Sequence, residues 1–251
     1  MSDRGEGETP ARRLTHKQSV EIALNDPAVR RAVAATESPL AIRRRQLYHE
    51  NARGVLKDLA EAGFPDLQSV GDLRRGHADY AGAVPVLLEW IPKVSYLMLS
   101  EDIVRTLSVA FAKRLAAPVF LRLFREPPAL QDPLRPETSE PPAEHLRWFI
   151  GGGLAVFAGP PLADDLIDLA LERRFGEARY QIVEALPKTK DARVVDVLTS
   201  LLDDPTIRAA AIGALGKMRY APARASIEAL LSDPHKHVRD QAKKALKRID
   251  S

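Results

Sequence analysis

The spacing of apolar and polar residues repeats in the last sixty residues of the chain. The segment 201–208, with sequence LLDDPTIR, returns as LLSDP at 230–234 followed by Val238 and Arg239. The alanine-rich stretch 210–218 returns at 241–249. The offset is 29 residues before the second stretch of the unit and 31 residues within it. A period near 30 residues with two helical stretches per period is typical of a helical solenoid.

The same pattern continues towards the N-terminus, less regularly, and no segment alternates apolar and polar residues with the period of a strand. Neither helix of a unit could bury its apolar stripe alone, so the units must stack. The sequence therefore predicts an all-α fold, an α-solenoid of about five helix pairs. The predicted pairs are 82–97 with 101–115, 117–125 with 144–158, 161–173 with 177–187, 191–202 with 205–218, and 221–231 with 235–249.

The chain before the solenoid has a different character. Residues 1–13 are polar and aperiodic, and we expect a disordered N-terminal tail there. Residues 14–80 are predicted to form an N-terminal helical cap and a connector, and its longest helix should run from Ser38-Pro39 to about Ala62. The solenoid then occupies 81–251 and carries a proline-rich loop insertion at 126–143, with six of the nineteen prolines. That loop is either a tolerated surface insertion or an interaction segment.

Composition narrows the function classes. The chain has no cysteine, which excludes disulfides, thiolate chemistry and cysteine-ligated zinc. The polar first residues do not resemble a secretory signal, so we expect a cytoplasmic protein. The most apolar stretch, 81–99, contains Glu89, Lys93 and two prolines, and we interpret it as buried helix rather than a membrane span.

Charge adds a hint about partners. The net charge is +3. Residues 1–60 hold eleven Lys and Arg against eight Asp and Glu, whereas the remainder is balanced. The final helix is locally basic, with Asp240 as its single acidic residue among six cations. Two basic ends are consistent with an anionic partner, although a nucleic-acid binder usually shows a broader basic stripe.

The repeated units resemble HEAT repeats, closest to the short bacterial kind called HEAT-like or phycobilisome-lyase-type repeats. The residues that carry this resemblance are LLDDPxIRxAAxxALG at 201–216 and LLSDP followed by VRxxAxxAL at 230–246. It is clearest over 190–250, extends less closely over 161–189 and only loosely over 81–158. It implies an α-solenoid whose second helices line a concave face and which binds other proteins. Some HEAT-like proteins bind DNA, including alkylpurine DNA glycosylases, and others handle tetrapyrroles.

The resemblance also assigns a role to repeated charges. In HEAT repeats the turn aspartate and the helix arginine bond to each other across adjacent units. We therefore expect a structural ladder rather than a row of cationic binding sites along the groove. Its members would be Asp102, Arg105, Arg179, Asp204, Arg208, Asp233 and Arg239.

Six other residues are candidates for contacting a partner. Arg147 and Trp148 lie beside the proline-rich loop, and Arg and Trp are enriched among interface anchors, although packing could also explain them. The complete set, placed on predicted second helices, is Arg147, Trp148, Tyr180, Thr206, Lys236 and Lys243. Trp90 is expected in the core. His235 and His237 are expected to face solvent because no third metal ligand is evident.

No catalytic constellation is visible in the sequence. There is no Ser/His/Asp arrangement, zinc signature or dinucleotide-binding glycine motif, and helix capping explains Asp164-Asp165 and Asp203-Asp204. We therefore favour a non-enzymatic scaffold or adaptor that binds another protein along the concave face, with no cofactor and no metal. The alternatives are a nucleic-acid-binding protein related to alkylpurine DNA glycosylases, whose catalytic positions cannot be matched here, and a tetrapyrrole lyase accessory protein.

Overall fold

The computed structural model describes residues 26–27, 38–76 and 79–251 of the 251-residue chain. The chain divides into two units, residues 1–47 and 48–251. The predicted disordered tail at 1–13 lies outside the described residues. In the first unit, helix α3 (Pro39–Glu61) begins, and the Ser38 hydroxyl caps it by accepting a hydrogen bond from the Ala41 amide at 3.2 Å.

In the second unit, α3 continues and ends in a glycine cap. Gly63 has φ 95°, a conformation that glycine adopts without steric cost. The Gly63 amide donates to the Ala60 carbonyl at 3.1 Å and the Phe64 amide to the Leu59 carbonyl at 2.9 Å. This pair of hydrogen bonds is the Schellman arrangement, which satisfies the last carbonyls of the helix.

Trp90 packs against Gly54 and donates its indole N–H to Asp58 at 2.7 Å. The residue is half-buried, and it is therefore not the core residue that the sequence predicted.

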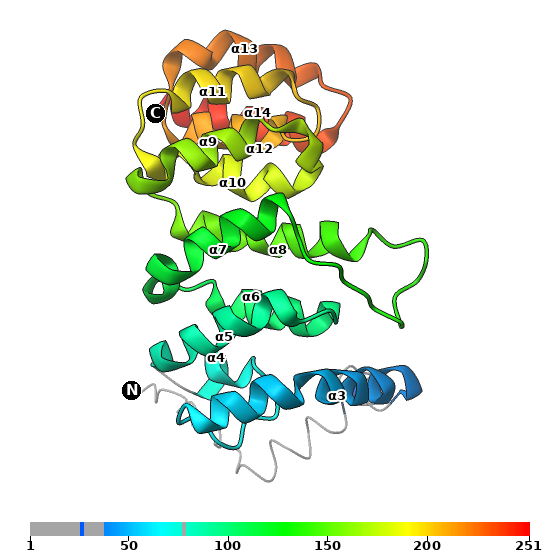
Figure 1. The fold of residues 1–251 in the computed structure, drawn as a ribbon. Helices are drawn as coiled ribbons and strands as arrows, with labels where there is room; N and C mark the ends of the chain where they lie inside the picture. Colours follow the sequence, from blue (N-terminus) through cyan, green and yellow to red (C-terminus); the bar gives the residue numbers. More distant parts are fainter. Residues whose placement is uncertain (1–25, 28–37, 77–78) are drawn as a thin grey trace, which may run out of the picture. The chain divides into compact units, whose positions relative to one another are not determined.

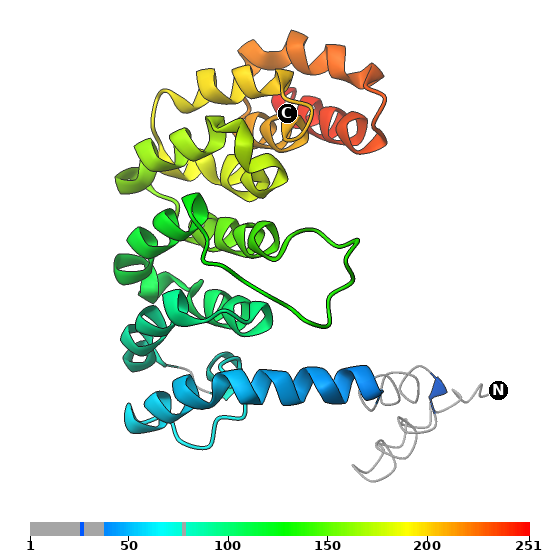
Figure 2. The same cartoon turned by 45° about the vertical axis from the view of Figure 1, so that its right-hand side comes forward.

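Residues 81–251 form an α-solenoid. The first helices of successive pairs lie in one layer and the second helices in another, as Figures 1 and 2 show. Each second helix packs against the next one along the chain. The first helices are α5 (Val84–Trp90), α7 (Lys113–Arg125), α9 (Ala163–Leu171), α11 (Val194–Ser200) and α13 (Arg224–Ala229). The second helices are α6 (Leu97–Leu107), α8 (Pro142–Phe157), α10 (Tyr180–Ala185), α12 (Arg208–Lys217) and α14 (Lys236–Ile249).

Short elements join these helices. Helix α4 (Asp72–Gly76) precedes the solenoid. Most first helices open or close with a 3₁₀ turn, which tightens the chain reversal. The 3₁₀ segments are η1 (Ala81–Ala83), η2 (Ile91–Lys93), η3 (Ala110–Ala112), η4 (Pro160–Leu162), η5 (Arg173–Arg179), η6 (Leu186–Thr189), η7 (Leu201–Asp203), η8 (Ala221–Ala223) and η9 (Leu230–Ser232).

The first two pairs differ from the predicted bounds. The second helix expected at 101–115 instead runs over 97–107, and α7 begins at Lys113 rather than 117. The chain turns at Ser108 and Val109, and Val109 is extended with φ −132° and ψ 150°. This turn contains neither glycine nor proline and lies within an apolar run, so periodicity does not reveal it.

The proline-rich connection between α7 and α8 is fixed near its middle. The Gln131 amide donates to the Ser95 carbonyl at 2.8 Å, and the Leu97 amide donates to the Gln131 carbonyl at 3.0 Å. These bonds form an isolated parallel bridge between Tyr96 and Gln131, and no strand occurs in the described part of the chain. Closer to α8, Arg135 of the connection contacts His145 of α8 at 3.5 Å, and the other ring nitrogen of His145 contacts Glu101 at 3.2 Å.

Small residues let the last two second helices approach closely. A Cβ added to Gly216 of α12 would lie 2.6 Å from the Ala245 Cβ and 2.7 Å from its Cα. By contrast, a Cβ on Gly213 would meet only ordinary contacts at 3.7 Å. The glycine at 216 is therefore a packing requirement, and the one at 213 is not.

Among the described residues, no helix is both long and apolar enough to cross a membrane.

These two glycines provide a matched test of the packing. Gly216→Ala should destabilise the protein by about 1–3 kcal/mol, because the methyl group forces α12 and α14 apart. Gly213→Ala should be neutral or stabilise by up to about 1 kcal/mol, because alanine favours the helix. Thermal unfolding followed by circular dichroism distinguishes them, and an equal effect of both changes would contradict the close approach at Gly216.

Candidate functional site

A buried ion pair joins two successive helix pairs. The guanidinium of Arg179, 1% exposed, donates to the Asp204 carboxylate at 2.8 Å. It also donates to the carbonyls of Ala170 at 3.1 Å and Gly176 at 3.0 Å. Asp204 in turn accepts the Thr206 amide at 3.0 Å, so the carboxylate holds its own turn as well as the previous unit. A buried charge with this many partners is satisfied, and Arg179 is not available to a ligand.

The next unit repeats this contact at the equivalent positions. Arg208 donates to the Asp233 carboxylate at 2.8 Å, and the His235 amide donates to the same carboxylate at 2.8 Å. Arg239 bonds differently, because it donates to the carbonyls of Asp233 at 2.7 Å and Pro234 at 2.8 Å. Two arginine–aspartate contacts between units are thus followed by one arginine that holds its own turn.

These contacts shift the pKa values of both aspartates downwards. Burial alone raises the pKa of Asp204, but the hydrogen bonds from Arg179 and the Thr206 amide, with the nearby positive charge, outweigh it. The pKa of Asp233 is lowered mainly by the His235 amide and, against some desolvation, by Arg208. Both carboxyl groups are therefore ionised at neutral pH.

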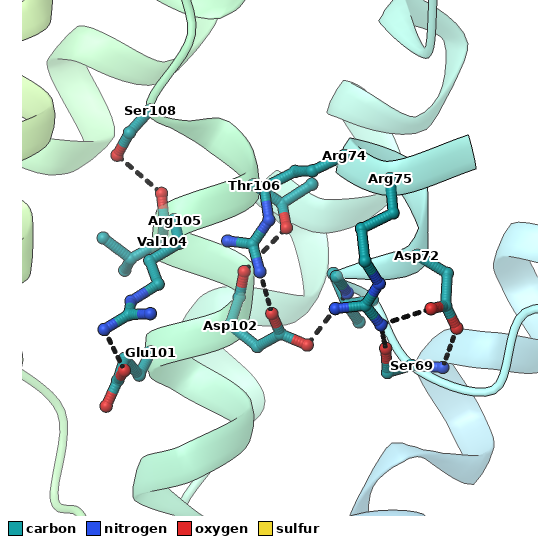
Figure 3. Close-up of polar contacts among 12 residues, drawn as sticks. Ser69, Asp72, Arg74, Arg75, Glu101, Asp102, Val104, Arg105, Thr106 and Ser108 are labelled. Carbon is teal, nitrogen blue, oxygen red and sulfur yellow. Dashed lines mark hydrogen bonds and ion pairs between the residues drawn. The ribbon is translucent and has the colours of Figure 1, made fainter. Parts of the chain in front are cut away.

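Asp102 and Arg105, the first expected members of the ladder, do not form an arginine–aspartate contact between successive helix pairs. Asp102 accepts hydrogen bonds from the Tyr48 hydroxyl at 2.6 Å and the Gly71 amide at 2.9 Å. It also accepts one from Arg74 at 2.7 Å (Figure 3). Arg105 instead pairs with Glu101 at 2.8 Å. The reason is positional, because Asp102 lies inside α6 rather than in the turn before it. Asp102 therefore fixes the connector around α4 to the solenoid.

The environment of Tyr48 follows from this arrangement. Its pKa is raised, first by burial and then by the charge of Asp102 and the hydrogen bond to it. The phenol remains protonated and donates to Asp102.

Arg105 makes a different contact. Its guanidinium lies 4.4 Å from the centre of the Phe149 ring, which is a cation–π contact between α6 and α8.

A groove of about 520 Å³ lies across the four second helices of the C-terminal pairs. Its walls are mainly apolar or aromatic, with one carboxylate and two imidazoles. It is lined by Trp148 of α8, by Glu177 and Tyr180 before and at the start of α10, by Pro205, Thr206 and Ala209 at α12, and by His235, His237 and Val238 at α14.

Three rings follow one another along this groove, here called the aromatic groove. The Trp148 and Tyr180 rings lie 6.4 Å apart, and the Tyr180 and His237 rings also lie 6.4 Å apart, each pair tilted by 34°. The Tyr180 hydroxyl contacts His237 Nε2 at 3.3 Å. The pKa of Tyr180 is raised by burial and then by Glu184. The rings thus form a row with one side in solvent, and Trp148 is 37% exposed.

Three of the six candidate contact residues, Trp148, Tyr180 and Thr206, line the aromatic groove. Arg147 does not, and its surroundings favour the packing alternative over a partner contact. Its side chain is buried, pairs with Glu144 and donates to the Phe124 carbonyl at 2.8 Å. One helical position separates it from Trp148, and a rotation of about 100° between neighbouring residues turns the two side chains to different faces.

The two candidate lysines lie elsewhere. Lys236 pairs with Asp240 at 3.4 Å, and both Lys236 and Lys243 are exposed on α14 without lining the aromatic groove. Sequence reasoning missed Glu177, and it placed His235 and His237 in solvent without assigning them a role. A signal for the histidines existed, because the repeat offsets of 29 and 31 residues both lead from Thr206 to them.

The groove chemistry points to binding. The described residues contain no group of three or more His, Asp or Glu side chains that could hold a metal ion. Aromatic faces, a hydroxyl and a single carboxylate provide stacking and hydrogen bonding to a bound group. They suit recognition of an extended ligand that lies across several helices.

Comparison with known proteins finds a family match for the C-terminal half of the solenoid. Residues 163–251 match the family model for HEAT repeats. The matched segment runs from α9 to α14 and includes both arginine–aspartate contacts between units. No curated protein and no solved structure matches the chain. The HEAT-repeat match therefore covers most of the aromatic groove, whereas Trp148 lies just before it.

The two arginine–aspartate pairs should differ in their contribution to stability. Asp204→Asn leaves the fully buried Arg179 without a carboxylate and should cost about 3 kcal/mol. Asp233→Asn should cost less, because the Arg208 side chain is 21% exposed and water can solvate it. Urea unfolding of the two variants tests this order, and a larger loss for Asp233→Asn would contradict it.

The stability of the protein should also depend on pH through the ionisation of Asp204. The pKa of Asp204 in the folded protein lies below the unfolded value of about 3.9. The ionised carboxylate therefore contributes its full stabilisation of the folded state above about pH 3.9. This stabilisation is lost as pH falls through the lower, folded pKa. The difference in melting temperature between the wild type and Asp204→Asn should therefore shrink below about pH 4. The exposed Asp196→Asn serves as control, and a difference independent of pH would refute the assignment.

Proposed function

We propose that this chain is a protein-binding scaffold with HEAT repeats that holds an extended segment of a partner protein in the aromatic groove. The observation that carries this proposal is the row of rings from Trp148 through Tyr180 to His237, which crosses successive second helices. Solenoids commonly use such a surface of stacked repeats to bind partners.

The exposed tryptophan is the main energetic argument. Large aromatic side chains on a surface are costly unless something covers them, and Trp and Tyr dominate binding energy at protein interfaces. The backbone around Trp148 is held in place, because Gln181 donates to its carbonyl at 3.3 Å. The Trp148 ring itself lies 6.4 Å from the Tyr180 ring. A side chain that already packs on a neighbour loses less conformational entropy when a partner stacks on it.

The charge of the groove favours one kind of partner segment. Glu177 lines the groove, and no ion pair involves it in the described part of the protein. Arginine and lysine are missing from the lining residues of this groove. A partner segment with a basic side chain next to an apolar one would pair with Glu177 while it stacks on the rings.

The same charge argues against nucleic acid in this groove. A phosphate backbone needs Lys and Arg along its path, and here the lining offers a carboxylate instead. The basic residues Lys244, Lys247 and Arg248 lie on α14 outside the groove lining. Titration of duplex DNA at two salt concentrations separates the alternatives, because binding to phosphates would weaken steeply with salt.

Site-specific photo-crosslinking tests the proposal in cells that produce the protein. A photoreactive amino acid at Thr206, on the groove wall, should capture a defined partner. The same amino acid at the exposed Ser226 of α13 should not. Equal capture at both positions would contradict binding along the groove.

Removal of the rings should weaken the captured complex. Trp148→Ala with Tyr180→Ala should reduce affinity by about a hundredfold, as expected when two aromatic anchors are lost. Leu231→Ala is a matched control, because Leu231 is also 37% exposed and lies outside the groove. The measurement is calorimetric titration with the identified partner segment. Unchanged affinity in the double variant, with an unchanged melting temperature, would overturn the proposal.

A further inference from the structure

A second groove lies in the layer of first helices, where α7 and α9 begin. Its volume is about 480 Å³. Its apolar walls come from η3 and α7 on one side and from η4 on the other. The walls are formed by Phe111, Ala117, Pro118, Pro161 and Leu162. It shares no lining residue with the aromatic groove, which belongs to the second helices.

Phe111 gives this groove an ordered aromatic surface. Its side chain is 49% exposed. The ring nevertheless packs edge-to-face on Tyr80, with centres 5.0 Å apart. Tyr80 is buried, and its hydroxyl donates to the Thr106 carbonyl at 3.0 Å. An exposed phenyl ring held on a buried tyrosine is an anchor that is ready before a partner arrives.

The polar lining of the groove is positive. Lys113 and Arg114, both in the first turn of α7, line it, and no carboxylate does. The Lys113 ammonium lies 3.0 Å from the position that a Cβ of Gly159 would occupy, so it sits between α7 and the turn before η4. No ion pair involves either cation in the part of the chain that the structure describes.

Nearby acidic residues are engaged elsewhere. Asp164, in the first turn of α9, pairs with Arg193 at 2.5 Å, and Asp165 pairs with Arg125 at 2.9 Å. Their charges are therefore compensated by other cations, and the positive charge at the groove is left for a partner.

We propose that this groove docks a segment of a partner protein that carries both apolar side chains and aspartate or glutamate. The apolar side chains would cover Phe111 and the two prolines, and the carboxylates would pair with Lys113 and Arg114. A basic segment would be repelled by the same two cations. A purely apolar segment would place these charges against hydrocarbon without compensation. This site is separate from the aromatic groove, so the protein would join two partners or two parts of one partner.

Two synthetic peptides test the proposal on the full chain. One fluorescein-labelled peptide of twelve residues carries leucines at helical spacing with glutamates between them, and the other carries lysines in place of the glutamates. Fluorescence anisotropy should show that the acidic peptide binds about tenfold more tightly or better at low salt. Added salt should reduce the difference. Equal binding of the two peptides would overturn the proposal.

Variants then locate the binding. Lys113→Glu with Arg114→Glu should weaken the acidic peptide about tenfold, and Phe111→Ala should weaken it without changing its salt dependence. Lys244→Glu with Lys247→Glu makes the same change in net charge on α14 and should leave binding intact. Unchanged binding in the Lys113/Arg114 variant, with a normal melting temperature, would overturn the proposal.

A second copy of the chain is the competing occupant. Sedimentation of the free protein measures this directly. Self-association that the Lys113/Arg114 variant abolishes would show that the groove holds another copy, and would contradict a separate partner. A monomer at all concentrations, together with acidic-peptide binding, supports the proposal. Since the aromatic groove is not involved, Trp148→Ala with Tyr180→Ala should not affect this peptide.

Discussion

The buried contact between Arg179 and Asp204 is the interaction on which the C-terminal solenoid depends. Apolar stripes bring the helices together, but a stripe alone allows neighbouring pairs to slide. One guanidinium that reaches the carbonyls of its own pair and the carboxylate of the next pair fixes both position and angle. Because Asp204 also orders the turn before α12, the same bond helps to set where Thr206 lies in the aromatic groove.

Close helix contact has a similar consequence for the groove surface. At Gly216 the backbone of α12 approaches Ala245 of α14, and this spacing keeps the last two second helices together. His237 on α14 can then reach the Tyr180 ring, although 57 residues separate them in the chain. The row of rings is thus a product of packing between units and not of any single helix.

Much of this arrangement was readable from sequence. The Asp-Pro turns at Asp204 and Asp233 mark where α12 and α14 are about to start. Each aspartate holds its turn by accepting the amide two residues on, that of Thr206 or His235. The failures have equally local causes. Asp102 and Arg105 imitate the repeat spacing, yet their helix begins several residues earlier, so Asp102 faces the connector. For Arg147, periodicity could not decide between packing and partner contact, because it does not distinguish a buried cation from an exposed one when apolar residues flank it.

The bridge at Gln131 changes how the proline-rich connection should be regarded. Two backbone hydrogen bonds to the segment before α6 divide the span from α7 to α8 into two shorter arcs. Each arc is closed at both ends, so its chain entropy is that of a short loop rather than a long one. Added or deleted residues in one arc leave the other arc undisturbed. The arc on the α8 side of Gln131, which includes Thr138 and Ser139, could therefore vary in length without loosening the helices that the connection joins.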